Sequence, residues 1–261
     1  MPAEGSADRE LRLAHRVAVV TGATSGLGEV IARRFAAEGA AVILNGRRAA
    51  LGESIASQLR TAGAEAAFVA GDVGDERTAV EIADVAKRRH GRIDVLVLNA
   101  GGSAYGGFRE ATPVEFDSLM RTNVRGVWLC ARAADPLLPD GASIVVMASV
   151  SSFVTDPSEI LYCMTKAAIM PLVRGMAREL GSRQIRVNAL CPGAIGGVGM
   201  TADLSAGPID RSGDLKAMLA ATPLGRLGTP EEVADGAVFL ASSQSSFMTG
   251  TSLVLDGGMM A

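Results

Sequence analysis

Short runs of valine, isoleucine and leucine recur along the chain, separated by segments whose apolar residues have helical spacing. The runs are bounded by turn residues and are too short for helices, so they predict buried strands, while the segments between them predict amphipathic helices. The expected strands cover 17–20, 41–44, 68–72, 93–101, 144–149, 185–193 and 252–258, and the expected helices cover 29–39, 49–63, 76–91, 113–134, 158–180 and 231–242.

The regular alternation of these elements predicts an α/β fold. The strand segments are continuous apolar runs rather than polar–apolar alternations, which is typical of a parallel sheet covered on both faces. No linker, repeat or low-complexity segment divides the chain. We therefore expect a single domain over 14–261, built on a doubly wound parallel sheet of about seven strands, after a mobile N-terminal tail at 1–13. Residues 194–228, rich in Gly, Ala, Ser, Thr and Pro, are interpreted as a substrate lid.

Composition excludes several classes of function. The chain has 261 residues, 48% of them hydrophobic and 20% charged, which suits a self-sufficient globular core. A net charge of −3 with scattered basic residues argues against nucleic acid as the main partner. Three cysteines without paired spacing indicate reduced thiols in a cytoplasmic protein, and two histidines argue against a zinc site. We find neither an apolar run of ~18–20 residues nor a signal peptide, so no membrane association is expected.

A glycine-rich turn, TGATSGLG at 21–28, joins the first strand to the first helix. Gly22, Gly26 and Gly28 allow the backbone to approach a ligand closely, and the helix start offers free N–H groups to a pyrophosphate. The spacing differs from the commonest dinucleotide fingerprint, so the turn alone is a weak signal. Its place between a strand and a helix nevertheless predicts dinucleotide binding.

The end of the second strand should select the cofactor, because an acidic residue there would hold the free ribose 2′-OH of NAD. The residues at the end of the second strand are Asn45, Gly46, Arg47 and Arg48. They offer no carboxylate and two guanidinium groups, which pair well with a 2′-phosphate. This favours NADP(H). The alternative is a solvated arginine pair at a helix start, in which case NAD(H) remains possible.

The stretch YCMTK at 162–166 places Tyr162 and Lys166 four residues apart, on one face of the expected helix. A nearby ammonium and an oxidised nicotinamide ring would lower the pKa of the phenol from about 10. The tyrosine could then exchange a proton with a substrate oxygen. Ser149 ends a strand, where ligands bind in open α/β sheets, and could hydrogen-bond the same oxygen. Ser151 and Ser152 are alternatives for this role.

Six short motifs and residues follow one another along the chain. They are TGATSGLG at 21–28, NAG at 99–101, Asn123, Ser149, YCMTK at 162–166 and CPG at 191–193. Together they resemble the short-chain dehydrogenase/reductase family in its single-domain branch, over roughly residues 14–260. The resemblance implies a Rossmann-like fold and an alcohol dehydrogenase or ketoreductase activity. The spacing from Ser149 to Tyr162 in that family also favours Ser149 over its neighbours.

The resemblance implies roles for individual residues. Tyr162 is the acid/base, Lys166 lowers its pKa and bonds the nicotinamide ribose, and Ser149 orients and polarises the carbonyl or alcohol. Asn123 holds a water that joins Lys166 to a proton relay. The implied cofactor contacts are Gly22, Thr24, Ser25, Gly26, Leu27, Gly28, Arg47, Arg48, Asp72, Val73, Asn99, Ala100, Gly101, Tyr162, Lys166, Pro192, Gly193 and Ile195. Within this set Asp72 contacts adenine, with Val73 beside it. The substrate residues are Ser149, Ser151 and Tyr162, and Ser103, Phe153, Glu159 and Ala194 are expected to face the substrate.

Two features depart from the family pattern. After Pro192-Gly193 a threonine usually follows within a few residues, but here glycines intervene and Thr201 comes late. We expect the backbone of Ile195 to hold the nicotinamide amide instead. Pro171 falls inside the helix that carries Tyr162, so the carbonyl of Ala167 loses its helical partner and a kink is possible.

These observations predict an enzyme that transfers a hydride between NADP(H) and a secondary alcohol or ketone. One alternative is an NAD(H)-dependent dehydrogenase of a sugar-like or other secondary alcohol. Another is a non-catalytic redox sensor, which would not need the four residues Ser149, Tyr162, Lys166 and Asn123 together. A homotetramer is expected from the resemblance and from apolar residues on more than one face of the helices at 113–134 and 158–180.

Overall fold

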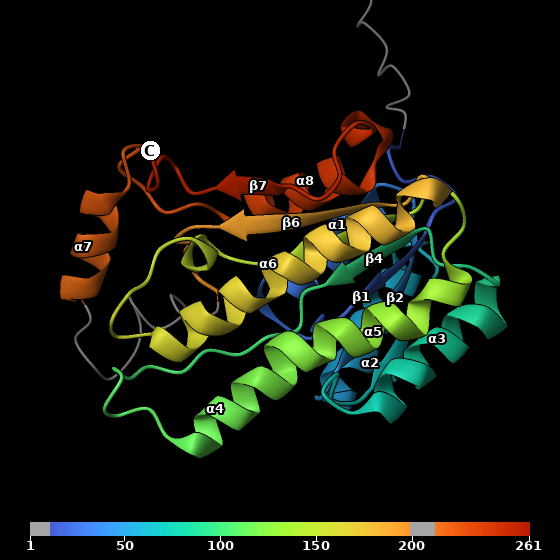
Figure 1. Cartoon of the computed structure of the whole chain (residues 1–261). Coiled ribbons are helices and arrows are strands. Elements are labelled where there is room, and N and C mark those ends of the chain that lie inside the picture. Colours follow the sequence, from blue (N-terminus) through green and yellow to red (C-terminus); the bar gives the residue numbers. More distant parts are fainter. Residues whose placement is uncertain (1–10, 199–211) are drawn as a thin grey trace, which may run out of the picture.

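A seven-stranded parallel sheet runs through the centre of the molecule (Figure 1). The computed structural model describes residues 11–198 and 212–261. The strand order is β3-β2-β1-β4-β5-β6-β7, so the winding direction reverses between β1 and β4. The strands are β1 Val17–Val20, β2 Ala41–Gly46, β3 Ala66–Ala70, β4 Val95–Leu98, β5 Ser143–Met147, β6 Arg186–Pro192 and β7 Ser252–Leu255. The expected doubly wound sheet is confirmed, and ligands bind such sheets where the winding reverses.

Helices cover both faces of this sheet (Figure 1). The α-helices are α1 Gly26–Ala37, α2 Ala49–Thr61, α3 Glu76–His90, α4 Pro113–Leu119, α5 Gly126–Ala134, α6 Ile160–Leu180, α7 Ser212–Ala221 and α8 Pro230–Ala241. A π-helix, η1, covers Met120–Arg125 between α4 and α5. Helices α3, α5 and α6 bury apolar residues on one face of the sheet, and α1, α2 and α8 do so on the other.

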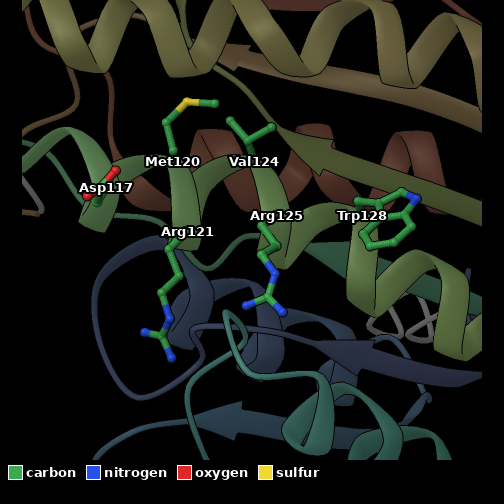
Figure 2. A pocket seen from close by; sticks show the side chains of 6 residues that line it. All are labelled: Asp117, Met120, Arg121, Val124, Arg125 and Trp128. Carbon is green, nitrogen blue, oxygen red and sulfur yellow. The ribbon is translucent and has the colours of Figure 1, made fainter.

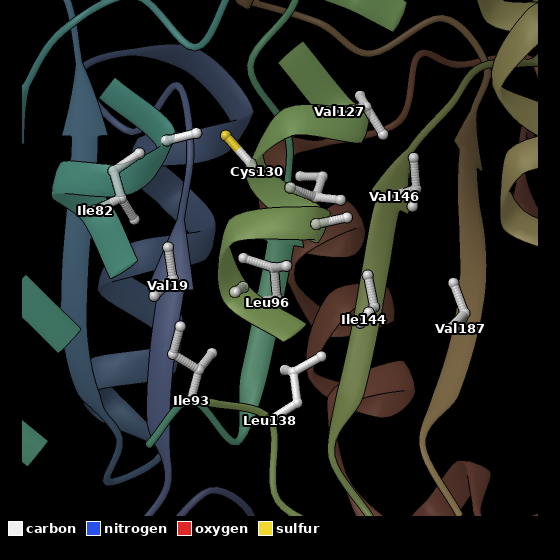
Figure 3. Packing of buried hydrophobic residues seen from close by; sticks show 14 of the residues in the cluster. Val19, Ile82, Ile93, Leu96, Val127, Cys130, Leu138, Ile144, Val146 and Val187 are labelled. Atoms are coloured by element: carbon white, nitrogen blue, oxygen red, sulfur yellow. The ribbon is translucent and has the colours of Figure 1, made fainter. Parts of the chain in front are cut away.

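The continuous apolar runs are explained by burial on two sides. In β1, Val19 packs with the cluster beneath α3, α5 and α6, while Val20 packs with the opposite cluster. Figure 3 shows the first cluster, in which Leu96, Ile144 and Val187 from three neighbouring strands line up below the helices. Because successive side chains of a strand point to opposite faces, both sets of positions must be apolar.

The expected helix at 113–134 is wrong in one respect, because η1 interrupts it at Met120–Arg125. A π-helix closes i→i+5 bonds and so changes the direction of the side chains that follow, which no periodicity argument anticipates. The expected strand at 93–101 ends earlier, at Leu98. There the side chain and N–H of Asn99 bond Thr21 in the glycine turn, so the backbone leaves the sheet.

Two expected segments lie partly outside the described residues. The lid at 194–228 contains α7, which the sequence pattern did not predict, while 199–211, including Thr201, lies outside the described part of the chain. Residues 1–10 of the expected tail are likewise outside it. Residues 11–13 differ from the expectation, because Leu13 is fully buried and its N–H donates to the Glu38 carbonyl at 3.0 Å.

Helix α6 runs without interruption through Pro171. Within the described residues, the stretch Ile160–Arg183 is long and apolar enough to span a membrane by length and composition alone. Ile169 and Val173 of this helix are completely buried against the sheet, which accounts for the apolar composition. Helix α6 is thus a core helix, and it carries Tyr162 and Lys166 to the carboxyl end of β5.

Candidate active site

The glycine turn is closed on its inner side. A Cβ on Gly28 would lie 2.3 Å from the carbonyl oxygen of Gly22 and 2.4 Å from Nδ2 of Asn99. A Cβ on Gly22 would lie 2.7 Å from Cα of Ala100, and Gly22 has a left-handed φ of +66°. Neither position can accept a side chain, since such contacts are shorter than van der Waals distance. The turn therefore packs directly on the residues that follow β4.

The outer side of the same turn is open. Among residues 11–198 and 212–261, a Cβ on Gly26 would approach only Val198, at 3.9 Å. Ser25 precedes α1, and its side chain makes no capping hydrogen bond within the described residues. The N–H groups of the first turn of α1 have the positive end of the helix dipole behind them, and within the described part of the chain no side chain fills the space next to Gly26. This cradle fits the pyrophosphate of a dinucleotide.

Asn99 and Thr21 hold the turn against β4. Nδ2 of Asn99 donates to the carbonyl oxygens of Thr21 at 3.0 Å and Gly22 at 3.2 Å. In return, Oγ1 of Thr21 accepts from the N–H groups of Asn99 and Ala100. Both hydrogen bonds of the Asn99 amide nitrogen are therefore made to the glycine turn, and this side chain fixes the shape of the turn.

At the end of β2 the two arginines have different environments. Nη2 of Arg48 donates to the carbonyl oxygen of Thr24 at 2.9 Å, so this guanidinium is held against the glycine turn. Arg47 is exposed, and its charge contributes to a lowered pKa of Asp72. Asn45 is fully buried, and its Nδ2 donates to the carbonyls of Val69 and Gly71 on the β3 side. No carboxylate occupies this position, and Arg47 is near enough to Asp72 for its charge to act on that carboxylate.

Asp72 lies in the turn between β3 and α3. Its Oδ1 accepts the N–H of Gly74 at 2.8 Å, and its Oδ2 accepts Nη1 of Arg121 at 2.8 Å. Burial raises the pKa of Asp72, but the bonds from Gly74 and Arg121 outweigh it and hold the pKa below its usual value. Asp72 is therefore an ionised acceptor at neutral pH, with capacity for a further donor.

Ser149, Tyr162 and Lys166 converge at the carboxyl end of β5. Nζ of Lys166 donates to the carbonyl oxygen of Met147 at 2.7 Å and lies 5.7 Å from the centroid of the Tyr162 ring. A hydrogen bond between Ser149 and Tyr162 favours the phenolate. This geometry brings two hydroxyl groups and one ammonium into the same region, where the hydroxyls could bind a substrate oxygen.

The three candidate serines are distinguished by their partners. Ser149 bonds Tyr162, and its Oγ also donates to Oγ of Ser151 at 3.1 Å. Oγ of Ser152 donates instead to the carbonyl oxygen of Lys166 at 2.9 Å, so it serves the backbone of α6. Ser149 is thus the serine that acts on the phenol, and Ser151 is its hydrogen-bond partner.

Burial dominates the pKa values of the pair on α6. It raises the pKa of Tyr162 to about 12, against the opposing effect of the Ser149 hydrogen bond, and the nearby carboxylate of Glu159 raises it further. Burial also lowers the pKa of Lys166 to about 8. The sequence predicted that the ammonium and an oxidised nicotinamide ring together would lower the phenol pKa, and this stays a prediction. The protein's own groups do not lower it, because Lys166 is itself desolvated and its Nζ donates to the carbonyl of Met147.

Asn123 lies in η1 and is 1% exposed. Its Nδ2 donates to the carbonyl of Gly102 and to Oγ1 of Thr165, both at 2.9 Å, while its Oδ1 accepts the N–H of Gly102. Oγ1 of Thr165 in turn donates to the carbonyl of Tyr162. Both amide donors are therefore occupied, and the side chain ties the loop after β4 to α6. Thr165 was missed by the sequence analysis, although its place between Tyr162 and Lys166 was the available signal.

The segment after β6 is pinned to the start of α8. Gly193 packs against Asp256, since a Cβ on it would lie 2.8 Å from Cβ of Asp256. Ile195 forms an isolated bridge with Gly228, supported by the bond from the Gly228 N–H to the carbonyl of Ala194 at 3.0 Å. Of the side chains expected to face substrate, Glu159 is buried just before α6, while Phe153 is 47% exposed.

Comparisons with known proteins agree with this geometry. Residues 22–260 match the family model described as enoyl-(acyl carrier protein) reductase. Oxidoreductase UcpA of Escherichia coli O157:H7 is 38% identical over 252 residues, which cover 95% of each chain.

Two solved structures have nearly the same backbone. A short-chain dehydrogenase/reductase from Serratia marcescens BCRC 10948 is 32% identical, with a TM-score of 0.88, over 96% of this chain and 100% of that one. A gluconate 5-dehydrogenase from Burkholderia cenocepacia J2315, in complex with NADP and tartrate, is 31% identical with a TM-score of 0.89, over 96% and 97% of the two chains.

Proposed function

Because this chain belongs to the short-chain dehydrogenase/reductase family, we propose that it transfers a hydride reversibly between NADP(H) and a secondary alcohol or ketone. The observation that carries the proposal is the convergence of Ser149, Tyr162 and Lys166 beside the open glycine turn. A dinucleotide site alone would support binding, whereas these three groups supply what a proton transfer needs.

In the proposed reduction, Tyr162 donates its phenolic proton to the substrate oxygen, and in oxidation it takes the proton back. Ser149 donates a hydrogen bond to the same oxygen and so favours the charge that develops there. When bound, the dinucleotide supplies the hydride in one direction and accepts it in the other. Lys166 would hold the nicotinamide ribose, and its charge, with that of the oxidised ring, would offset the effect of burial on the pKa of the phenol.

The residues proposed to hold the dinucleotide run in order from its pyrophosphate and adenosine half to its nicotinamide. The turn formed by Gly22, Thr24, Ser25, Gly26, Leu27 and Gly28 receives the pyrophosphate. Arg47 and Arg48 lie at the adenosine ribose, Asp72 and Val73 lie at the adenine, and Asn99, Ala100 and Gly101 flank the adenosine half. Pro192, Gly193 and Ile195 border the nicotinamide. The bridge between Ile195 and Gly228 supports this last assignment, because it fixes the backbone that would meet the amide.

The preference for NADP(H) rests on Arg47. Arg47→Asp should weaken NADPH binding by roughly ten- to a hundredfold, since a charge-assisted hydrogen bond contributes about 1.5–3 kcal/mol. The dissociation constant for NADH should change by less than about threefold, because NADH carries no 2′-phosphate to lose. Parallel fluorescence titrations with the two reduced cofactors measure both constants.

Arg88→Asp is the matched control for that change. Arg88 is an exposed arginine of α3, paired with Glu81 at 3.1 Å, so the same reversal of charge there should leave both constants unaltered. Equal weakening of NADPH and NADH by Arg47→Asp would show that Arg47 only shapes the loop. Tighter binding of NADH by the unaltered protein would favour the alternative, an NAD(H)-dependent dehydrogenase of a sugar-like or other secondary alcohol.

The substrate class stays broad in this proposal. The substrate residues proposed are Ser149, Ser151 and Tyr162, with Ser103, Phe153, Glu159 and Ala194 around them. This mixture of polar and apolar side chains suits a sugar-like polyol, a hydroxysteroid-like ring or a biosynthetic ketone. The neighbour described as a gluconate 5-dehydrogenase supports including polyhydroxy acids among the first compounds tested.

We also propose that the protein is a cytoplasmic homotetramer. An open cavity of about 470 Å³ lies on the outer face of α4, η1 and α5, lined by Met120, Val124 and Trp128 among others (Figure 2). Elsewhere on the surface, Phe247, which precedes β7, is fully exposed, and Leu224, whose N–H donates to the carbonyl of Gly257 after β7, is 67% exposed. Exposed apolar groups of this kind mark association surfaces. Light scattering should give about four times the chain's 26.8 kDa, and a monomeric mass would contradict the proposal.

A further inference from the structure

Two arginines of η1 bind the turn that carries Asp72. Nη1 of Arg121 donates to Oδ2 of Asp72 at 2.8 Å, and its Nη2 donates to Oδ1 of Asp75 at 2.6 Å. Nη1 of Arg125 donates to the carbonyl oxygen of Gly74 at 2.5 Å. Both arginines line the outer cavity together with Met120 and Val124, and Figure 2 shows their guanidinium groups pointing away from those two side chains.

The turn and η1 also fit each other in shape. A Cβ on Gly74 would lie 2.7 Å from Cγ of Arg121, so the stem of this arginine lies directly on the turn. A Cβ on Gly126 would lie 2.7 Å from Cγ2 of Val73. Larger residues at either glycine would separate the two segments. The arginine contacts therefore belong to a packed junction and not to isolated surface pairs.

Stability alone is a weak explanation for this junction. The Arg121 side chain is 40% exposed and that of Asp75 is 58% exposed, and exposed ion pairs contribute little to folding. The contact with Asp72 differs, because that carboxylate is held from two sides, by Arg121 and by the N–H of Gly74. A carboxylate fixed in this way is oriented for a third donor, whereas a free one would rotate.

We infer that Arg121 is a positioning residue for the adenine end of the dinucleotide, acting through Asp72. The inference rests on the proposed function for the identity of the ligand. It adds that η1 serves both ends of the site. One side of this π-helix places Asn123 against Gly102 and Thr165 near Tyr162, and the other side holds the adenine turn through Arg121 and Arg125.

The test compares Arg121→Gln with the unaltered protein by calorimetric titration of two cofactor fragments. ADP-ribose contains the adenine half, and reduced nicotinamide mononucleotide contains the other half. Arg121→Gln should weaken ADP-ribose roughly five- to twentyfold, because one charge-assisted bond to Asp72 is lost. Binding of the mononucleotide should stay within about twofold, since the loss is confined to the adenine turn. Arg88→Gln, on the exposed arginine of α3, is the control and should alter neither constant.

Arg121→Lys provides a second variant that keeps the charge. It should retain one of the two carboxylate contacts and so bind ADP-ribose with intermediate strength. If Arg121→Gln does not fold, ADP-ribose binding by Arg121→Lys tests the inference in its place. Unchanged ADP-ribose binding in these variants would overturn the inference, as would equal weakening of both fragments, which would indicate a general loosening of the fold. If the unaltered protein bound neither NADPH nor NADH, the proposed function would fail as well.

Discussion

Replacing Tyr162 by phenylalanine should lower kcat/KM for ketone reduction by roughly 10²–10⁴-fold, the range that general acid catalysis contributes. The change removes one oxygen atom and with it the proton donor and the Ser149 hydrogen bond. The ring remains in place beside Lys166, whose Nζ lies 5.7 Å from its centroid. The dissociation constant for NADPH, measured by fluorescence titration, should therefore change by less than about threefold.

Tyr105→Phe is the matched control, because Tyr105 and Tyr162 are the chain's two tyrosines. It should retain the activity, and it leaves Tyr162 as the single phenol for an ultraviolet pH titration. Burial disfavours the phenolate, so the midpoint in the free protein should be displaced upward, to about 12. Adding NADP⁺ places a positive ring nearby and should lower that midpoint. Turnover that survives Tyr162→Phe, or a midpoint that NADP⁺ does not move, would contradict the mechanism.

Lys166→Met should stabilise the fold while removing activity. Burial lowers the pKa of Lys166 to about 8, so the folded state disfavours the ammonium that the unfolded chain keeps up to about 10.5. Methionine removes that penalty, although the carbonyl of Met147 loses its 2.7 Å donor. The net gain should be on the order of 1–2 kcal/mol at pH 7, seen as a higher unfolding midpoint in urea. Activity should fall at least about a hundredfold, because Tyr162 loses its electrostatic partner.

The pH dependence of stability identifies the cause. Between pH 8 and 10.5 the unfolded chain binds more protons at this lysine than the folded protein does, so stability should rise with pH across that window. In Lys166→Met the rise should disappear. Lys87→Met, at an exposed position of α3, should change neither stability nor slope. A lower unfolding midpoint for Lys166→Met at pH 7 would show that the lysine stabilises the fold, contrary to this account.

Elements with strong local signals could be predicted from the sequence. Helix α3 was expected at 76–91 and covers Glu76–His90, because its apolar residues have helical spacing and Gly91 ends it with a left-handed φ of 73°. The apolar runs located the strands, but they did not show where each strand ends. β4 stops at Leu98 because the side chain of Asn99 turns back to Thr21, which is 78 residues earlier. Contacts of that range leave no local pattern.

The same distinction applies to the site. The motif residues of the glycine turn and of α6 could be identified because each forms a local pattern, a strand–turn–helix in one case and an i,i+4 pair in the other. Arg121 could not, since its partner Asp72 lies 49 residues away. Helix α7 was missed because its apolar residues are spread around the helix instead of forming one face. The upward effect of burial on the pKa of Tyr162 was not anticipated, because burial is not visible in a helical spacing.

The central claim is that this site moves a hydride and does not merely bind a dinucleotide. The most direct test uses NADPH deuterated at C4 of the nicotinamide ring, incubated with polyhydroxy, cyclic and open-chain ketones, with mass spectrometry of the alcohols formed. The account predicts that one deuterium enters the carbinol carbon of a product with the unaltered protein and with Tyr105→Phe, but not with Tyr162→Phe. The account would be contradicted if the protein bound NADPH tightly but no alcohol contained deuterium and the corresponding alcohols did not reduce NADP⁺. That result would favour a non-catalytic redox sensor.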